Sequence, residues 1–229
     1  YAVRRGDSLY RQSTVLPAVP MWWGTLDATR AQSEVDHLGS GAMATDWGHR
    51  IISKESADYD PLSYHHGSVW PLFTGWASMG AYEYTRPHVG YQALMASALL
   101  TRQDALGYVT ELLSGDYNTA FGRTSHHQIW SEAMVVTPAV RGLLGIETRD
   151  AGQTLRVAPQ VPAAWDTVRV QNVQTGASPY DLALTRTDDA YRIALTPQDT
   201  ETSVDRIVVA PALPRDAQVR GATVNGAEA

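Results

Sequence analysis

Cysteine is absent from the 229 residues of the sequence. Its absence excludes disulfides, thiol nucleophiles and Cys-ligated zinc, but it identifies no compartment, because a core of this size needs no cross-links. Basic residues are also in the minority: 18 Lys and Arg face 24 Asp and Glu, for a net charge of −6. Such a chain lacks the basic surface that nucleic-acid binding requires, so we expect no nucleic-acid partner.

Long apolar runs are also missing. None approaches the roughly 20 residues that a membrane helix needs, and we expect no membrane partner. No secretory signal pattern is present either, and the localisation stays undetermined. The hydrophobic content of 44% predicts a packed core. Because the sequence begins at Tyr1 and its first residues are typical of a protein interior, we expect a fragment of a longer protein.

The first two thirds of the sequence predict an α-helical region. An apolar stretch with two prolines, residues 14–26, is followed by periodic segments separated by a long polar loop at 40–65. Pro138 is expected to kink the last helix. The predicted helices cover residues 28–39, 67–84, 88–107 and 125–144.

After Gly145 the sequence pattern changes to short β-prone runs separated by Gly, Pro and Asp turns. The TDDA sequence at 187–190 is typical of a hairpin turn. We therefore predict an α region followed by a β region: a helical domain at 1–147 and a small antiparallel β-sandwich at 148–229. The runs are 154–158, 166–173, 180–186, 190–196, 203–209 and 217–224.

Chemistry-bearing side chains are concentrated in the helical region. Six of the seven Trp and all seven His lie within the first 130 residues, which suits a sugar-binding site, although composition alone favours ordinary core and surface aromatics. There is no GxSxG elbow and no Gly-rich phosphate loop. The pairs His65–His66 and His126–His127 lack the i, i+4 spacing of a helical zinc site. We therefore expect neither a metal nor another cofactor.

Three segments combine polar and aromatic groups at the edges of helices: YHHGSVWP (64–71), YVTELLSG (108–115) and SHHQIWSE (125–132). Glu111 lies among apolar neighbours, an environment that suits a general acid or base. Each segment also has a structural interpretation, since Trp70 and Trp130 could pack in a core. Glu132 would complement a helix dipole, and we assign it no other role.

These segments resemble those of a known superfamily. YHHGSVWPL resembles the YHxGxVWPW stretch of bacterial glycogen-debranching (amylo-α-1,6-glucosidase) enzymes, and TDWGHRIIS is similar to their WGxRxLS segment. TELLSGDY followed by HQIWSEAMVV resembles their SElfdG…QaWSvA pattern, and is similar to motifs of glucoamylases (glycoside hydrolase family 15) and family 63 α-glucosidases. The order and spacing of the motifs over residues 45–146 agree with these six-hairpin glycosidases.

The resemblance implies a fold and a set of roles. The fold is the C-terminal portion of an (α/α)6 toroid, about five helices of twelve, followed by an accessory β-sandwich. Glu111 matches the general base that activates water in an inverting, exo-acting hydrolase, with α-glucosides or oligosaccharides as the expected substrates. The matching residues around the sugar are Arg50, Tyr64, His66, Gly67, Trp70, Gln128 and Trp130.

One component of the resemblance has no match. An inverting enzyme needs a second carboxylic acid, which these families carry on an earlier hairpin, and Asp46, Asp58, Asp60 and Glu132 do not match it. We therefore expect the remaining N-terminal part of the barrel, on the same or a separate chain, as a partner. Without it the inner helix faces would expose apolar surface. The alternatives are a non-catalytic carbohydrate-binding or structural half-barrel, and another six-hairpin specificity such as a rhamnosidase, trehalase or glucuronyl hydrolase.

Overall fold

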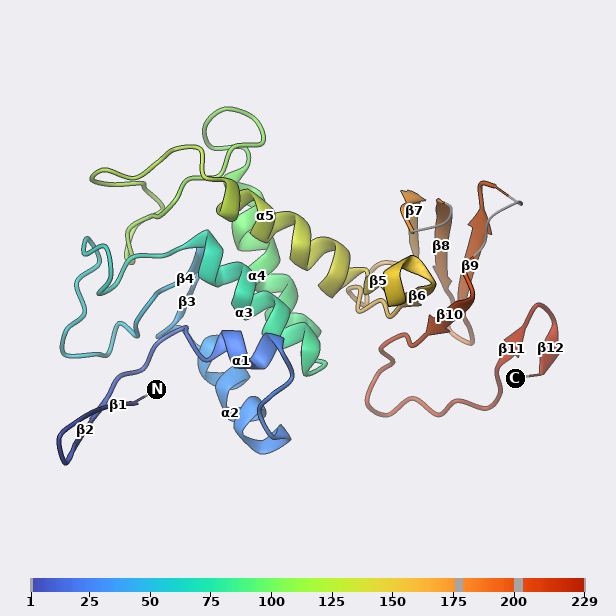
Figure 1. Ribbon diagram of the computed structural model, residues 1–229, viewed down its shortest axis with the longest axis horizontal. Coiled ribbons are helices and arrows are strands. Elements are labelled where there is room, and N and C mark those ends of the chain that lie inside the picture. Colours follow the sequence, from blue (N-terminus) through green and yellow to red (C-terminus); the bar gives the residue numbers. More distant parts are fainter. Residues whose placement is uncertain (1, 176–178, 200–203, 229) are drawn as a thin grey trace.

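A computed structural model describes residues 2–175, 179–199 and 204–228 (Figure 1). The helices gather at one end of the molecule and most of the strands at the other, with the chain passing from helices to sheets near residue 145 (Figure 1). None of the helices within these ranges is long and apolar enough to span a membrane.

Helix α3 is the centre of the helical region. Its thirteen residues are buried along most of their length and pack against α1, α4 and α5. The core beside it contains Met21, Leu38 and Trp70. The helices in chain order are α1 (Ala18–Trp22), α2 (Ala28–Leu38), α3 (Pro71–Glu83), α4 (Pro87–Leu100) and α5 (Ile129–Thr137).

The prediction for residues 28–39 is confirmed by α2. The Asp27 side chain accepts a hydrogen bond from the Arg30 backbone N–H at 3.0 Å and so caps the first turn, and Gly39 occupies the C-cap. The predictions for the later helices are wrong at their ends. Helix α3 starts at Pro71 because Val69 is extended and pairs with another strand-like segment.

Helix α4 ends at Leu100, and the following residues to Gly107 form turns rather than the predicted helical continuation. Helix α5 begins four residues later than predicted, because 125–128 pair with the segment that carries Glu111. Pro138 does not simply kink this helix. A π-helix, η1 (Pro138–Leu143), starts at the proline, whose missing N–H removes one helical hydrogen bond.

Two hairpins occur where the sequence predicted none. Strands β1 (Ala2–Arg5) and β2 (Ser8–Arg11) pair near the N-terminus. Strands β3 (Ala44–Thr45) and β4 (Gly48–His49) pair inside the polar loop at 40–65. Two-residue strands of this kind carry too little alternation to be recognised in a sequence.

The β region contains two three-stranded sheets that share a core. The hydrophobic cluster of Leu155, Val157, Tyr180 and Leu182 draws on strands of both sheets, as expected for a sandwich. The first sheet has the order β10-β6-β5 and the second β7-β8-β9. Their strands are β5 (Ile146–Arg149), β6 (Thr154–Val157), β7 (Thr167–Val173), β8 (Tyr180–Arg186), β9 (Tyr191–Pro197) and β10 (Arg206–Val209).

The predicted hairpin at 187–190 is confirmed, since the Thr187 N–H donates to the Ala190 carbonyl at 2.9 Å between β8 and β9. The pairs β5–β6, β7–β8 and β8–β9 are antiparallel, as predicted for the sandwich, but β10 runs parallel to β6, which the prediction did not include. A strand at 146–149 was missed. The run predicted at 217–224 is a strand only in β11 (Thr223–Val224), which pairs with β12 (Ala227–Glu228). Residue 203, the start of another predicted run, lies outside the described residues.

The helical and β regions meet around α3. The side chain of Gln160 donates to the Tyr82 carbonyl at 2.8 Å, and the rings of Tyr91 and Trp165 are in edge contact. Strand β5 crosses the predicted boundary between residues 147 and 148. The division into two domains and the closure of the helices into a toroid stay predictions.

His49 on β4 makes the stability of the fold depend on pH. Its side chain is 2% exposed. Burial lowers the pKa of His49 to about 4, opposed by a hydrogen bond to the Leu38 backbone and assisted by the charge of Arg50. His49 therefore becomes protonated near pH 6.5 in the unfolded chain, but only near pH 4 in the folded chain.

We expect this histidine to cost about 3 kcal/mol of unfolding free energy as the pH falls from 7 to 4, because the loss begins below the unfolded pKa and ends at the folded one. Urea unfolding at several pH values measures it. The His49→Leu variant should lose that part of the pH dependence, whereas the variant of exposed His88, His88→Gln, should keep it. Equal pH slopes for the wild type and His49→Leu would show that His49 is not the cause.

Candidate functional site

Backbone pairing at Val69 brings three of the sequence motifs together. Arg50 and Leu113 form antiparallel bridges on either side of Val69. The Val69 N–H donates to the Leu113 carbonyl at 2.9 Å, and the Leu113 N–H donates back to Val69 at 2.9 Å. Val69 and Leu113 are both fully buried. Segments 19 and 44 residues apart in the sequence therefore lie edge to edge.

The fourth motif segment joins the same arrangement on its other side. The Glu111 N–H donates to the Ser125 carbonyl at 2.8 Å, and the Gln128 N–H donates to the Val109 carbonyl at 3.0 Å. Gln128 is extended, and α5 starts directly after it. The segment that carries Glu111 is consequently fixed between the segments of Val69 and Ser125.

The Glu111 carboxylate is held by one donor on each oxygen. The Tyr64 hydroxyl donates to Oε1 at 2.5 Å, and the Ser125 N–H donates to Oε2 at 3.2 Å. The residue is only 9% exposed. A carboxylate has about four acceptor positions, so each oxygen keeps a lone pair for a further donor such as water. The carboxylate can therefore still accept a hydrogen bond or a proton from a ligand or water.

Tyr64 is itself held in place by the helix start at Trp70. The Ser68 hydroxyl donates to the Tyr64 carbonyl at 2.8 Å and accepts from the Trp70 indole N–H at 2.8 Å. The rings of Trp70 and His65 each meet the Tyr64 ring edge to face at 4.8 Å. The hydrogen bond to Glu111 raises the pKa of Tyr64, as do burial and the charge of Glu111.

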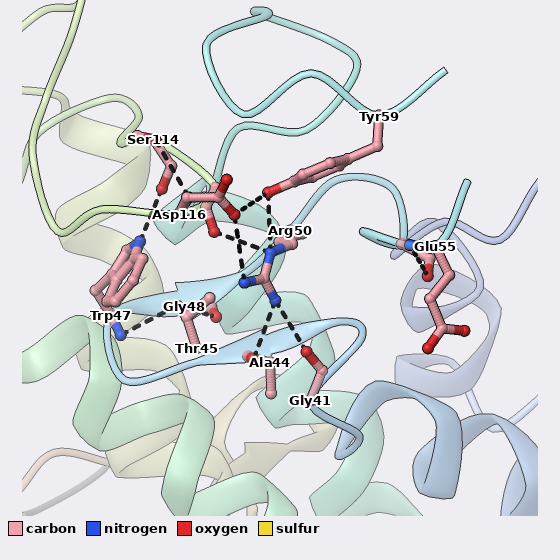
Figure 2. A network of polar contacts seen from close by, with 12 residues as sticks. Gly41, Ala44, Thr45, Trp47, Gly48, Arg50, Glu55, Tyr59, Ser114 and Asp116 are labelled. Carbon is pink, nitrogen blue, oxygen red and sulfur yellow. Dashed lines mark hydrogen bonds and ion pairs between the residues drawn. The ribbon is translucent and has the colours of Figure 1, made fainter. Parts of the chain in front are cut away.

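Arg50 is occupied by protein acceptors (Figure 2). Its Nε donates to the Gly115 carbonyl at 2.9 Å and to the Tyr59 hydroxyl at 3.2 Å. Its Nη1 donates to the carbonyls of Gly41 and Ala44 at 3.2 and 3.3 Å. The side chain is buried, and this geometry favours a structural role over the sugar contact that the resemblance implies.

Asp116 and Tyr59 complete the Arg50 network, and the sequence analysis missed both (Figure 2). Tyr59 donates to Asp116 at 2.7 Å, and Asp116 lies 4.0 Å from Arg50 Nη2. Burial and the hydrogen bond to Asp116 raise the pKa of Tyr59 to about 12. The one available signal was the position of Asp116, directly after the Ser-Gly turn that follows Glu111.

Gly67 has a packing reason to be glycine. A Cβ at this position would lie 2.8 Å from the Tyr59 ring and closer still to the Asp60 carbonyl. Gly115 faces it in turn, and a Cβ there would overlap the Gly67 carbonyl. Two chain segments can approach this closely only without side chains. The predicted contact between Gly67 and sugar stays a prediction.

The remaining predicted residues surround α5 and the helix start of α3. Trp70 is 6% exposed and belongs to the core, whereas Trp130 in the first turn of α5 is 41% exposed. His66 is exposed, and Gln128 is the N-cap residue of α5. Their roles toward a substrate stay predictions.

Glu132 has a partner that the sequence did not reveal. The His127 ring nitrogen Nε2 lies 3.0 Å from Glu132 Oε1, and the same ring stacks on Tyr108 at 3.9 Å. As predicted, Glu132 lies in the first turn of α5, where a carboxylate complements the helix dipole.

A cavity lies away from Glu111, at the junction of the helical and β regions. Its volume is about 180 Å³, and its walls include Tyr82, Arg141, Arg156 and Gln160 but none of the predicted site residues. Across the described ranges, no three His, Asp or Glu side chains gather closely enough to hold a metal ion.

Comparison with known proteins gives one informative likeness. No family model and no curated protein matches the sequence. A GH78 family rhamnosidase of Bacillus sp. GL1 matches over 90% of this chain and 20% of its own, with 15% identity and a TM-score of 0.54. At this identity the likeness shows a shared fold, and this chain spans a fifth of that glycoside hydrolase.

An uncharacterized conserved protein from Thermus thermophilus matches over 57% of this chain and 31% of its own, with 19% identity and a TM-score of 0.43. A score this low adds nothing to the assignment of the fold.

We expect Arg50→Lys to destabilise the protein by about 2–4 kcal/mol, because a lysine cannot satisfy the several acceptors around the guanidinium and leaves buried carbonyls unpaired. Urea unfolding measures the change. The control is Arg30→Lys, because Arg30 is 81% exposed beside Asp27 and should change stability by less than about 0.5 kcal/mol. Equal stability of the two variants would contradict the structural role of Arg50.

Proposed function

We propose that this chain is the C-terminal part of an inverting, exo-acting glycoside hydrolase that acts on α-glucosides, with Glu111 as the general base. The observation that carries the proposal is the position of the Glu111 carboxylate, where three motif segments meet and Tyr64 and Ser125 hold its two oxygens. The likeness in fold to a glycoside hydrolase is consistent with it.

The proposed reaction requires a water molecule between Glu111 and the sugar. Glu111 accepts a proton from this water as its oxygen attacks the anomeric carbon, and the bond to the leaving group breaks on the opposite face. The leaving oxygen takes a proton from a general acid. In inverting enzymes the two carboxyl groups lie roughly 6.5–9.5 Å apart. The proposal assigns that acid to the part of the barrel that this sequence does not contain.

Recognition of the sugar is assigned chiefly to side chains that the structure leaves accessible. Trp130 offers a partly exposed ring for stacking on a sugar face, and His66 and Gln128 offer polar groups nearby in the sequence motifs. Trp70 and Arg50 are buried and hydrogen-bonded to protein atoms, so their contribution is to support the site.

The proposal also requires the rest of the barrel as a partner. One face of α5 and η1 carries exposed apolar side chains at helical spacing: Ile129, Ala133, Val136 and Val140. Ile129 is 74% exposed and Val136 61%. An apolar stripe of this kind is typical of a helix that packs on another helix, which fits a neighbouring hairpin of the toroid.

We expect Glu111→Gln in the complete enzyme to reduce kcat by about 10²–10⁴-fold, because an amide cannot accept the proton of the attacking water. Release of nitrophenol from 4-nitrophenyl α-glucoside measures it, with the α-rhamnoside assayed in parallel because a rhamnosidase shares the fold. Polarimetry during hydrolysis of an α-glucoside reports whether the anomeric configuration inverts.

The control is Glu55→Gln, which alters an exposed glutamate and should leave kcat unchanged. Activity of Glu111→Gln within about tenfold of the wild type would refute the assignment of the base. If the wild type hydrolyses only the rhamnoside, the substrate class is wrong but the base can stand. If no glycoside is hydrolysed, a non-catalytic carbohydrate-binding half-barrel becomes the better description.

A further inference from the structure

We propose that Tyr64 is a positioning residue for Glu111 rather than a sugar contact, and that its hydroxyl fixes the orientation in which the carboxylate receives the proton of water. This inference rests on the proposed function of Glu111. The evidence is the 2.5 Å hydrogen bond from the Tyr64 hydroxyl to Glu111 Oε1, together with the opposing bond from the Ser125 N–H to Oε2.

The two donors differ in origin, and together they stop rotation of the carboxylate. Ser125 belongs to the segment whose backbone is hydrogen-bonded to Glu111, so the position of its N–H is fixed by the backbone. Tyr64 approaches from the loop before α3, 47 residues away in the sequence. Loss of the phenol would leave one donor and allow the carboxylate to turn about its last bond, at a cost in alignment with the attacking water.

Tyr64 is rigid enough for this task. Its carbonyl accepts hydrogen bonds from the Ser68 hydroxyl and the Trp70 indole, at 2.8 and 3.2 Å. Its ring is bordered by the edges or faces of Trp70 and His65. Tyr64 is 44% exposed, and these two ring contacts together with the hydrogen bond to Glu111 orient its hydroxyl toward the carboxylate.

The phenol also keeps its proton in the range where an enzyme of this kind works. The hydrogen bond to Glu111 raises the pKa of Tyr64, with burial and the charge of Glu111 acting in the same direction. The single hydroxyl proton is thus committed to the carboxylate and is not available to a sugar. His65, whose ring touches Tyr64, is the other titratable side chain with a defined contact to this pair.

In the complete enzyme we expect Tyr64→Phe to lower kcat about tenfold and to leave KM within about threefold, because alignment is lost while sugar contacts remain. Tyr117→Phe, which removes an exposed hydroxyl from the loop after Glu111, should change neither quantity. His65→Gln should keep the wild-type kcat and KM, which separates the effect from loss of the ring contact between His65 and Tyr64.

A second measurement needs no activity and no change at Tyr64. With ¹³Cζ-labelled tyrosine, NMR should show that the Tyr64 phenol titrates at higher pH in the wild type than in Glu111→Gln, because the hydrogen bond and the charge of the Glu111 carboxylate raise its pKa. An unchanged Tyr64 titration in Glu111→Gln would overturn the contact itself.

The outcomes separate the inference from the proposed function. If Glu111→Gln stays active, the proposed function fails. If Glu111→Gln is inactive while Tyr64→Phe keeps the wild-type kcat, only the positioning role fails. If Tyr64→Phe raises KM alone, Tyr64 is a sugar contact and the inference is overturned. Thermal melting of Tyr64→Phe close to the wild type confirms that the comparison is made between folded proteins.

Discussion

The paired backbone of Val69 is the constraint on which the rest of the candidate site depends. Its two neighbours, Arg50 and Leu113, belong to different loops: Arg50 directly follows the short strand β4, and Leu113 lies in an irregular segment. Buried backbone groups must find partners, and here they find them in one another. The start of α3, the burial of Arg50 and the position of Glu111 follow from this pairing, because each lies within a few residues of a bridge.

The two buried charged residues beside this pairing, Arg50 and Glu111, differ in how fully protein groups satisfy their hydrogen-bonding capacity. Arg50 is surrounded by backbone carbonyls and Asp116. Its guanidinium links the loops that carry these groups, whose oxygens would otherwise lack a hydrogen-bond donor. Glu111 has two donors and retains free lone pairs. Arg50, whose partners are all protein groups, therefore stabilises the structure. Glu111 retains lone pairs that can accept a hydrogen bond from a ligand.

The exposed apolar face of α5 and the parallel pairing of β10 with β6 could not be predicted from local sequence patterns. Periodicity identified α5 as apolar, but only the packing shows which of its residues lack a partner. In the β region, turn chemistry at 187–190 was sufficient for one hairpin. The direction of β10 depends on the path by which the chain leaves β9 and comes to lie beside β6. No local sequence pattern predicts that path.

The sequence by itself determined the features that depend on neighbours along the chain: the helix predicted at 28–39, the hairpin turn at 187–190 and the order of α and β regions. It also brought Glu111 to attention through its motif. Only the tertiary structure decided the contact of Tyr64 with Glu111, the engagement of Arg50 and the π-helix after Pro138. These depend on distances between segments far apart in the sequence, and such distances are fixed by packing rather than by local propensity.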